Sequence, residues 1–164
     1  MNSLQKFSNA VNKVVCWIGA VFFVILIVAC VSQVFFRFVL NHSLSWTEEL
    51  ARYAFIWMHM IGASLLICNS GHASVTAILD QLSSSVKKLV EIFIEIVILV
   101  NGALMTYGGF YLSYATRTNL STAMSVPMWC INSSVFVGGA LLILQAITKM
   151  VLLTSSEPHE GGVA

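Results

Sequence analysis

Two adjacent carboxylates and an arginine at the start of an apolar segment form the densest set of reactive groups in the sequence. Arg52 follows Glu48 by four residues and Glu49 by three, so on a helix it lies within reach of both acids. Ser45 stands three residues before Glu48, the spacing of a capping box that closes a helix N-terminus. We therefore predict that this cluster begins a helix and neutralises its own charges. A second interpretation adds Arg37, at the end of the preceding apolar segment, as a partner of Glu49 that ties two helices together.

A second pair of acids, Glu91 and Glu95, lies one helical turn apart near the start of another apolar segment, on the same face as Lys87. A carboxylate inside hydrocarbon costs on the order of 3 kcal/mol and usually faces a partner or water. Three interpretations of Glu95, the deeper acid, remain open. It snorkels to the interface or pairs within the bundle, it contacts another subunit, or it couples transport to protons.

Catalytic and cofactor chemistry find little support in the remaining residues. A haem in a helix bundle usually takes paired axial ligands, but His59 is the only histidine within an apolar segment, and we interpret it as a hydrogen-bonded packing residue. The four cysteines are scattered singly, with no Cys-x-x-Cys pair for a metal or a redox couple. No nucleophile triad and no glycine-rich phosphate loop occurs. We therefore expect no catalytic residue, no metal and no cofactor.

The elements that carry these residues follow from the composition. Hydrophobic residues make up 58% of the 164-residue chain and charged residues only 9%, against roughly a quarter charged in ordinary soluble domains. So few charged side chains cannot cover a soluble protein of this size. The sequence predicts an integral membrane protein in contact with lipid, and a net charge of +1 gives no basic field for nucleic acid.

Four apolar segments are long enough to span a bilayer, whose hydrocarbon core of about 30 Å requires about 20 helical residues. We predict an all-α membrane protein with transmembrane helices over 14–40, 46–68, 88–114 and 126–150, in one domain of residues 1–152. Residues 153–164 are polar and glycine-rich and are predicted to form a disordered tail.

A short segment between the second and third spans has a helical pattern of its own. Over about 74–84, apolar residues recur at i, i+3, i+4 and i+7, from Val75 to Leu82. We predict a short amphipathic helix at the membrane interface. The alternative is a helical turn packed on the bundle.

The basic residues set the direction of the spans. Five lysines fall on one side of the predicted membrane, whereas Arg37, Arg52 and Arg117 fall on the other. The positive-inside rule then favours both termini in the cytoplasm. Trp46 suits an aromatic anchor at the opposite interface.

Small residues in the third and fourth spans predict close helix packing. They are Gly102, Gly108 and Gly109 in the third span and Ser134, Gly138 and Gly139 in the fourth. The pattern indicates a tight contact but does not identify its partner.

The stretch over about 37–82 resembles the small membrane subunit, the Q subunit, of the tripartite ATP-independent periplasmic (TRAP) transporters, the DctQ family. The residues that carry the resemblance are a Trp-x-Glu-Glu start to the second helix, an arginine, a glycine, a Gly-His step and an aspartate: Trp46, Glu48, Glu49, Arg52, Gly62, Gly71, His72 and Asp80. The rest of the chain matches only in length and number of spans. Ala73 departs from the family pattern, in which a β-branched residue often follows the histidine.

The resemblance implies a non-catalytic subunit of the bacterial inner membrane. It would scaffold a large elevator-type M subunit during sodium-coupled uptake of an organic acid, sialic acid or a C4-dicarboxylate, delivered by a periplasmic binding protein. The first and third spans, the latter with Glu91 and Glu95, are candidates for contact with the M subunit. Glu48, Glu49 and the 117–127 loop with Arg117 are candidates for docking the binding protein.

Two other functions fit the composition less well. A stand-alone four-helix exporter would use Glu95 as its coupling acid. A membrane redox anchor would need haem or thiol chemistry, which the single histidine within a span and the unpaired cysteines argue against.

Overall fold

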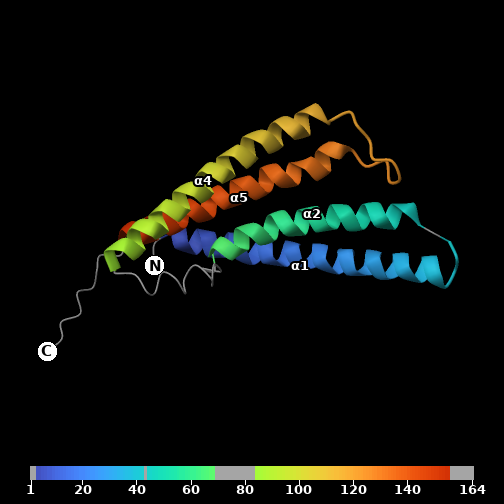
Figure 1. The fold of residues 1–164 in the computed structure, drawn as a ribbon, viewed down its shortest axis with the longest axis horizontal. Helices are drawn as coiled ribbons and strands as arrows, with labels where there is room; N and C mark the ends of the chain where they lie inside the picture. Colours follow the sequence, from blue (N-terminus) through green and yellow to red (C-terminus); the bar gives the residue numbers. More distant parts are fainter. Residues whose placement is uncertain (1–2, 43, 69–83, 156–164) are drawn as a thin grey trace.

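The computed structural model describes residues 3–42, 44–68 and 84–155. These residues form four long helices, α1 (Ser3–Phe38), α2 (Ser45–Cys68), α4 (Ser84–Ala115) and α5 (Met128–Ser155) (Figure 1). Each contains a segment long and apolar enough to cross a membrane, which confirms the predicted all-α architecture with four spans. Helices satisfy their own backbone groups, as hydrocarbon requires. The amphipathic helix predicted over 74–84 lies outside the described residues.

The helices are longer than the apolar segments that predicted them. α1 has 36 residues, roughly 54 Å at 1.5 Å per residue, against a hydrocarbon core of about 30 Å. It begins at Ser3 rather than at residue 14, so its first turns are polar. At the other end of the chain, α5 continues to Ser155, three residues into the segment predicted as a tail.

The polar first turns of α1 are held by a side chain of α5. Gln145 is 3% exposed. It accepts a hydrogen bond from the Ser8 hydroxyl at 3.0 Å and donates one to the Asn12 side chain. The amide of this one buried glutamine therefore bonds two polar side chains in the part of α1 that precedes its apolar segment.

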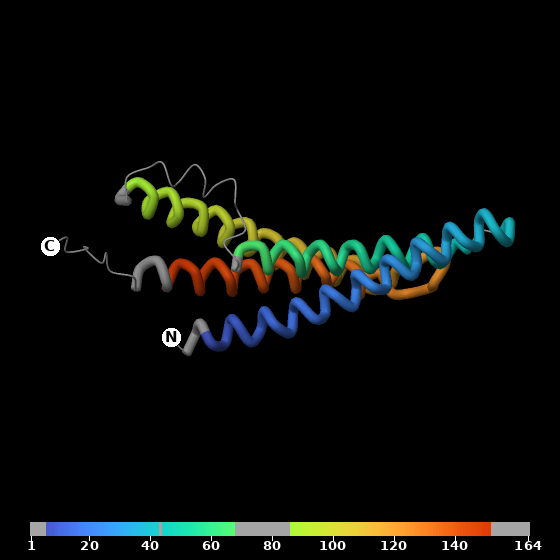
Figure 2. Tube along the Cα trace, turned by 90° about the horizontal axis from the view of Figure 1, so that it is seen from below, coloured from blue at the N-terminus to red at the C-terminus, as the bar shows by residue number. Residues whose placement is uncertain are grey.

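The four helices lie in a row of two hairpins rather than in a closed bundle (Figures 1 and 2). α1 packs on α2 and α4 packs on α5, and α5 joins the hairpins through its contact with α2 and a smaller one with α1. Among the described helices α4 has an extensive contact with α5 alone. The start of α1 and the end of α5 lie at the same end of the molecule (Figure 1).

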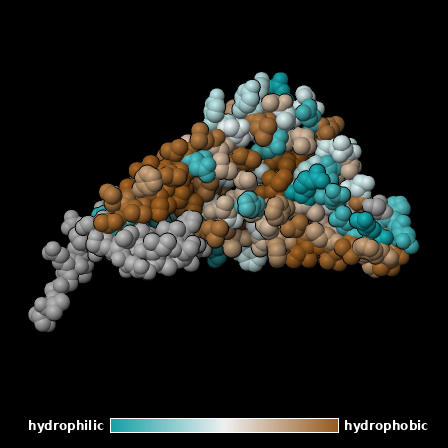
Figure 3. All heavy atoms as spheres, in the orientation of Figure 1, coloured by the Kyte–Doolittle hydropathy of each residue, from teal (hydrophilic) through white to brown (hydrophobic). Residues whose placement is uncertain are grey.

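The row leaves large apolar surfaces uncovered. On α4, Leu89, Phe93, Leu104 and Tyr107 are 65–77% exposed. Figure 3 shows an apolar surface over α4 and polar side chains gathered where α1 joins α2 and where α4 joins α5. Apolar surface of this extent faces lipid or another membrane protein.

Glycines bring α4 and α5 together, as the small residues predicted. A Cβ atom on Gly109 would lie 2.5 Å from the backbone nitrogen of Phe136, and one on Gly139 would lie 2.7 Å from the backbone nitrogen of Thr106. The backbones are therefore too close for a larger residue at either position. A Cβ on Gly138 would instead meet α2 at 3.0 Å, so α5 presents a small residue to each neighbour.

Asn41 closes the end of α1. Its φ of 50° is left-handed, a conformation that asparagine tolerates better than most residues. The next residue, His42, donates its backbone N–H to the carbonyl of Phe36 at 3.0 Å. The chain can then reverse into α2 within a few residues.

Candidate functional site

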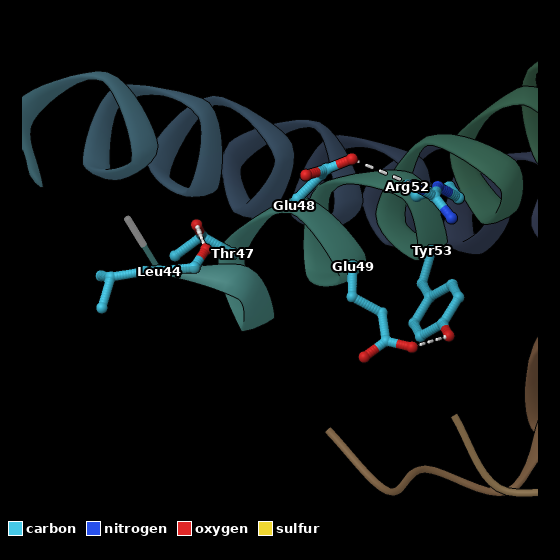
Figure 4. Close-up of polar contacts among 6 residues, drawn as sticks. All are labelled: Leu44, Thr47, Glu48, Glu49, Arg52 and Tyr53. Carbon is cyan, nitrogen blue, oxygen red and sulfur yellow. Dashed lines mark hydrogen bonds and ion pairs between the residues drawn. The ribbon is translucent and has the colours of Figure 1, made fainter. Parts of the chain in front are cut away.

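The first turn of α2 carries the predicted charged cluster, but its hydrogen bonds differ from the prediction (Figure 4). The Glu48 carboxylate bonds the Arg52 guanidinium at 3.2 Å and does not return to Ser45 as in a capping box. Thr47 instead donates its hydroxyl to the Leu44 carbonyl at 2.7 Å. A guanidinium one turn away is a stronger donor for a carboxylate than a neutral backbone N–H.

Glu49 points away from that pair, toward the α4–α5 connection (Figure 4). One carboxylate oxygen, Oε2, accepts the backbone N–H groups of Ala123 at 2.9 Å and Met124 at 2.8 Å. The other, Oε1, accepts the Tyr53 hydroxyl. Glu49 is only 8% exposed. Its charge is therefore satisfied by three donors, two of them from residues more than seventy positions away in the sequence.

The structure does not bring Arg37 to Glu49. The Arg37 guanidinium lies 5.7 Å from the centroid of the Phe38 ring, and no ion pair joins it to an acid within the described ranges. Arg52 bonds Glu48 and leaves Glu49 to the loop. The predicted tie between α1 and α2 through Glu49 is therefore not formed, and Glu49 instead joins α2 to the α4–α5 connection.

The α4–α5 connection, residues 116–127, is a loop closed by an antiparallel bridge between Leu120 and Pro127. Ser121 donates its backbone N–H to the Val126 carbonyl at 2.9 Å, and the Ser121 hydroxyl accepts the Val126 N–H at 3.1 Å. Ser125, with φ of 54°, takes the left-handed conformation that the turn requires. Thr122, Ala123 and Met124 lie within this turn, between Ser121 and Val126, and we call them the crest. The N–H groups of Ala123 and Met124 bond Glu49.

Two shallow depressions flank this crest. One, of about 720 Å³, is lined by Glu49, Arg52 and Thr122 among others. The second, of about 590 Å³, is lined by Trp46 and His42 and again by Thr122. Both are open and bordered by the same loop, so the loop position sets the shape of this end of the molecule.

Arg117, at the start of the connection, is exposed and lies over an aromatic ring. Its guanidinium stands 4.4 Å from the centroid of the Tyr114 ring. At this distance the cation is attracted to the face of the ring.

At the opposite end of the molecule, Glu95 and Lys149 form a buried ion pair. The distance between Glu95 Oε1 and Lys149 Nζ is 2.9 Å, and the two side chains are 1% and 28% exposed. Of the three interpretations of Glu95, the structure supports pairing within the chain, with Lys149 as the partner. Glu95 Oε2 has no hydrogen-bond partner among the described residues. Glu91, one turn earlier, is half-buried.

The groups considered for redox chemistry stand apart from one another. The His59 ring stacks on the Phe55 ring, with 5.9 Å between centroids. Cys16 and Cys30 are exposed free thiols, and Cys130 is a half-buried one. Within residues 3–42, 44–68 and 84–155 no three His, Cys, Asp or Glu side chains are grouped to hold a metal ion.

Three motif residues, Gly71, His72 and Asp80, lie outside the described residues. Trp46 is 46% exposed, as an interfacial anchor would be. A Cβ on Gly62 would meet nothing within 4 Å. The space beside this glycine is therefore open in the isolated chain.

Sequence reasoning missed the role of Tyr53 and the loop backbone. Tyr53 follows Glu49 by four residues, a spacing that could have suggested the hydrogen bond. No residue pattern could have indicated the N–H donors of Ala123 and Met124, because backbone donors are the same in every sequence.

Comparison with known proteins gives consistent matches. Residues 26–155 match the family described as tripartite ATP-independent periplasmic transporters, DctQ component. The chain is 29% identical over 119 residues to the sialic acid TRAP transporter small permease protein SiaQ of Vibrio cholerae, covering 72% of this chain and 68% of that one. It is 25% identical over 156 residues to a putative TRAP transporter small permease protein of Haemophilus influenzae, covering 92% of each. It is also 24% identical over 90 residues to the sialic acid TRAP transporter permease protein SiaT of Haemophilus influenzae, which is 55% of this chain but only 15% of that protein.

Proposed function

The chain belongs to the DctQ family of TRAP transporter components, and from this premise we propose that it scaffolds a large elevator-type M subunit during sodium-coupled uptake of an organic acid. The family match over residues 26–155 carries this proposal. The chain is a multi-pass inner-membrane protein and a component of a transporter. Its own residues would act by packing and positioning rather than by catalysis.

The uncovered face of α4 supports a large membrane partner. Asn101 is exposed near the middle of the span Val86–Ala115, where its side chain bonds the Met105 sulfur, at 3.8 Å, and no other described residue. An amide at this depth is costly against lipid and is better satisfied by a hydrogen bond to another helix. Tyr107, 77% exposed, presents a hydroxyl on the same helix. We assign this face to the M subunit.

The similarity to SiaT supports the same arrangement. The matched segment makes up only 15% of that permease. A sequence like this one therefore occurs within a much larger membrane permease. This chain would meet a comparable large permease as a separate subunit.

Two relatives are named for sialic acid, so we propose sialic acid as the transported acid, ahead of a C4-dicarboxylate. In this proposal the substrate is selected by the binding protein and the M subunit. The small subunit then contributes no substrate ligand.

The end of the molecule where α2 begins would face the periplasm, with both termini in the cytoplasm. There the binding protein would meet the exposed Glu48 and Arg117 and the crest of the α4–α5 connection. Glu48 and Arg52 are 63% and 64% exposed, so a partner can reach them.

Reconstitution tests the function. Proteoliposomes carrying this chain and its M subunit, supplied with the binding protein, labelled sialic acid and an inward sodium gradient, should accumulate the label. Vesicles that lack this chain, the binding protein or the gradient should not. Accumulation by this chain alone would show a stand-alone transporter, and full activity of the M subunit without it would remove the scaffolding role.

A further inference from the structure

Within the described residues, the backbone N–H groups of the α4–α5 connection that bond α2 both bond the Glu49 side chain. The turn from Ser121 to Val126 closes on itself with two hydrogen bonds. The N–H groups of Ala123 and Met124 lie outside that pattern and bond Glu49 Oε2. The Glu49 carboxylate therefore ties Ala123 and Met124 directly to α2.

Glu49 is poorly placed to touch a partner directly. It is 8% exposed and both of its oxygens are bonded, whereas the adjacent Glu48 is 63% exposed. Tyr53, which donates to Glu49 Oε1, also contacts the Met128 sulfur at 3.8 Å, at the first residue of α5. Glu49 thus lies beneath the crest, where Figure 4 shows it pointing toward the connection.

The exposed surface above Glu49 is the part that a partner can reach. Thr122, at the crest, is exposed and lines both depressions. A shift of the crest would change both depressions together. A carboxylate that accepts two backbone N–H groups holds such a turn firmly, because charge-assisted hydrogen bonds are stronger than neutral ones.

We propose that Glu49 is a positioning residue for the transporter, which fixes the α4–α5 connection in the shape that the periplasmic binding protein docks on. This inference rests on the proposed function. Glu49 acts through the loop, and the contacts with the partner are made by the crest around Thr122 and the exposed charges beside it.

The hydrogen bonds between Glu49 and the α4–α5 connection are tested first, without a transport assay. Amide hydrogen exchange is followed in the purified complex of this chain with its M subunit, for wild type, Glu49→Ala, Glu49→Gln and Tyr53→Phe. In Glu49→Ala the segment 120–126 should exchange on the order of tenfold faster, because two hydrogen bonds to a charged group are lost. Glu49→Gln and Tyr53→Phe, which each remove part of the set, should fall between. Lys88→Ala, an exposed charge at the opposite end of the molecule, is the matched control and should match wild type.

Uptake by the same variants then tests the docking role. The half-saturating concentration of binding protein should rise on the order of tenfold in Glu49→Ala, with the maximal rate within about twofold of wild type. Glu49→Gln, which keeps the shape of the side chain and an acceptor oxygen, should recover part of the loss and remains informative if Glu49→Ala fails to assemble. A purely structural role would instead lower the maximal rate and leave the half-saturating concentration unchanged.

The outcomes are separable. Unchanged exchange in Glu49→Ala would show that Glu49 does not hold the α4–α5 connection in place. Faster exchange with unchanged dependence on binding protein would overturn the positioning role and leave the scaffolding function intact. Absence of uptake in the wild-type complex would count against the proposed function itself, whatever the exchange shows.

Discussion

Glu95 and Lys149 illustrate how a buried charge is held inside an otherwise apolar hairpin. Their 2.9 Å contact joins α4 to α5. Truncating one partner of a buried ion pair leaves an uncompensated charge and costs more than replacing both partners with apolar residues. The pair therefore predicts a specific pattern among single and double variants.

Lys149→Met should lower the free energy of unfolding of the detergent-solubilised protein by about 3 kcal/mol, because Glu95 would lose its cation. The double variant Glu95→Met/Lys149→Met should recover most of that loss. Unfolding monitored by circular dichroism gives both values. A double variant less stable than Lys149→Met would contradict this account and favour a polar role for Glu95.

Arg52 and Glu48, by contrast, form an exposed ion pair. Both side chains are about two-thirds exposed, and exposed pairs contribute about 0–1 kcal/mol. Arg52→Ala should therefore change the free energy of unfolding by less than about 1 kcal/mol in the same assay. A larger loss would show that Arg52 has a partner beyond Glu48.

At the scale of the elements, the α4–α5 hairpin depends on backbone contact at glycines. Gly108 and Gly109 are adjacent in α4 but differ in surroundings. A Cβ on Gly109 would lie 2.5 Å from backbone of α5, whereas one on Gly108 would meet nothing within 4 Å. The two positions form a matched pair.

Gly109→Ala should destabilise the protein by about 1–3 kcal/mol, the usual cost of overpacking a close contact. Gly108→Ala should be neutral or slightly stabilising, since alanine favours the helix. Thermal unfolding of the two variants in detergent measures the difference. Equal effects at both positions would mean that α4 and α5 are not in backbone contact there.

At the scale of the whole molecule, the open row of helices explains why the chain would function in a complex. α4 packs on one helix only among those described, and its outer face carries Asn101 near mid-span. Either α1 or α4 could meet the M subunit on sequence grounds. The exposed amide favours α4, since α1 presents a mainly apolar surface around Val31, which is 63% exposed.

Single cysteines replacing Leu104 on α4 and Val31 on α1, in a chain without its native cysteines, distinguish these faces. Leu104→Cys should form cross-links with the M subunit through a short bifunctional maleimide, and Val31→Cys should not. Asn101→Leu should reduce the amount of M subunit that co-purifies. Cross-links from Val31 alone would move the interface to α1.

The sequence by itself determined the membrane class, the four helices and the family resemblance, because apolar composition, span length and motif residues are local properties. The family is confirmed by the match over residues 26–155. The helix boundaries were less predictable: α1 begins eleven residues before the predicted start, and Gln145, far away in the sequence, bonds Ser8 and Asn12 in that added part.

Only the tertiary structure decided which partner each charged residue takes. Helical spacing placed Arg52 within reach of both acids. In the structure Arg52 bonds Glu48, whereas Glu49 bonds the backbone of the α4–α5 connection. Glu95 likewise pairs with Lys149, which lies on another helix. Helical spacing limits which neighbours on one helix can meet, but contacts between helices depend on how the hairpins pack, and the close glycine contacts of α4 with α5 set that packing.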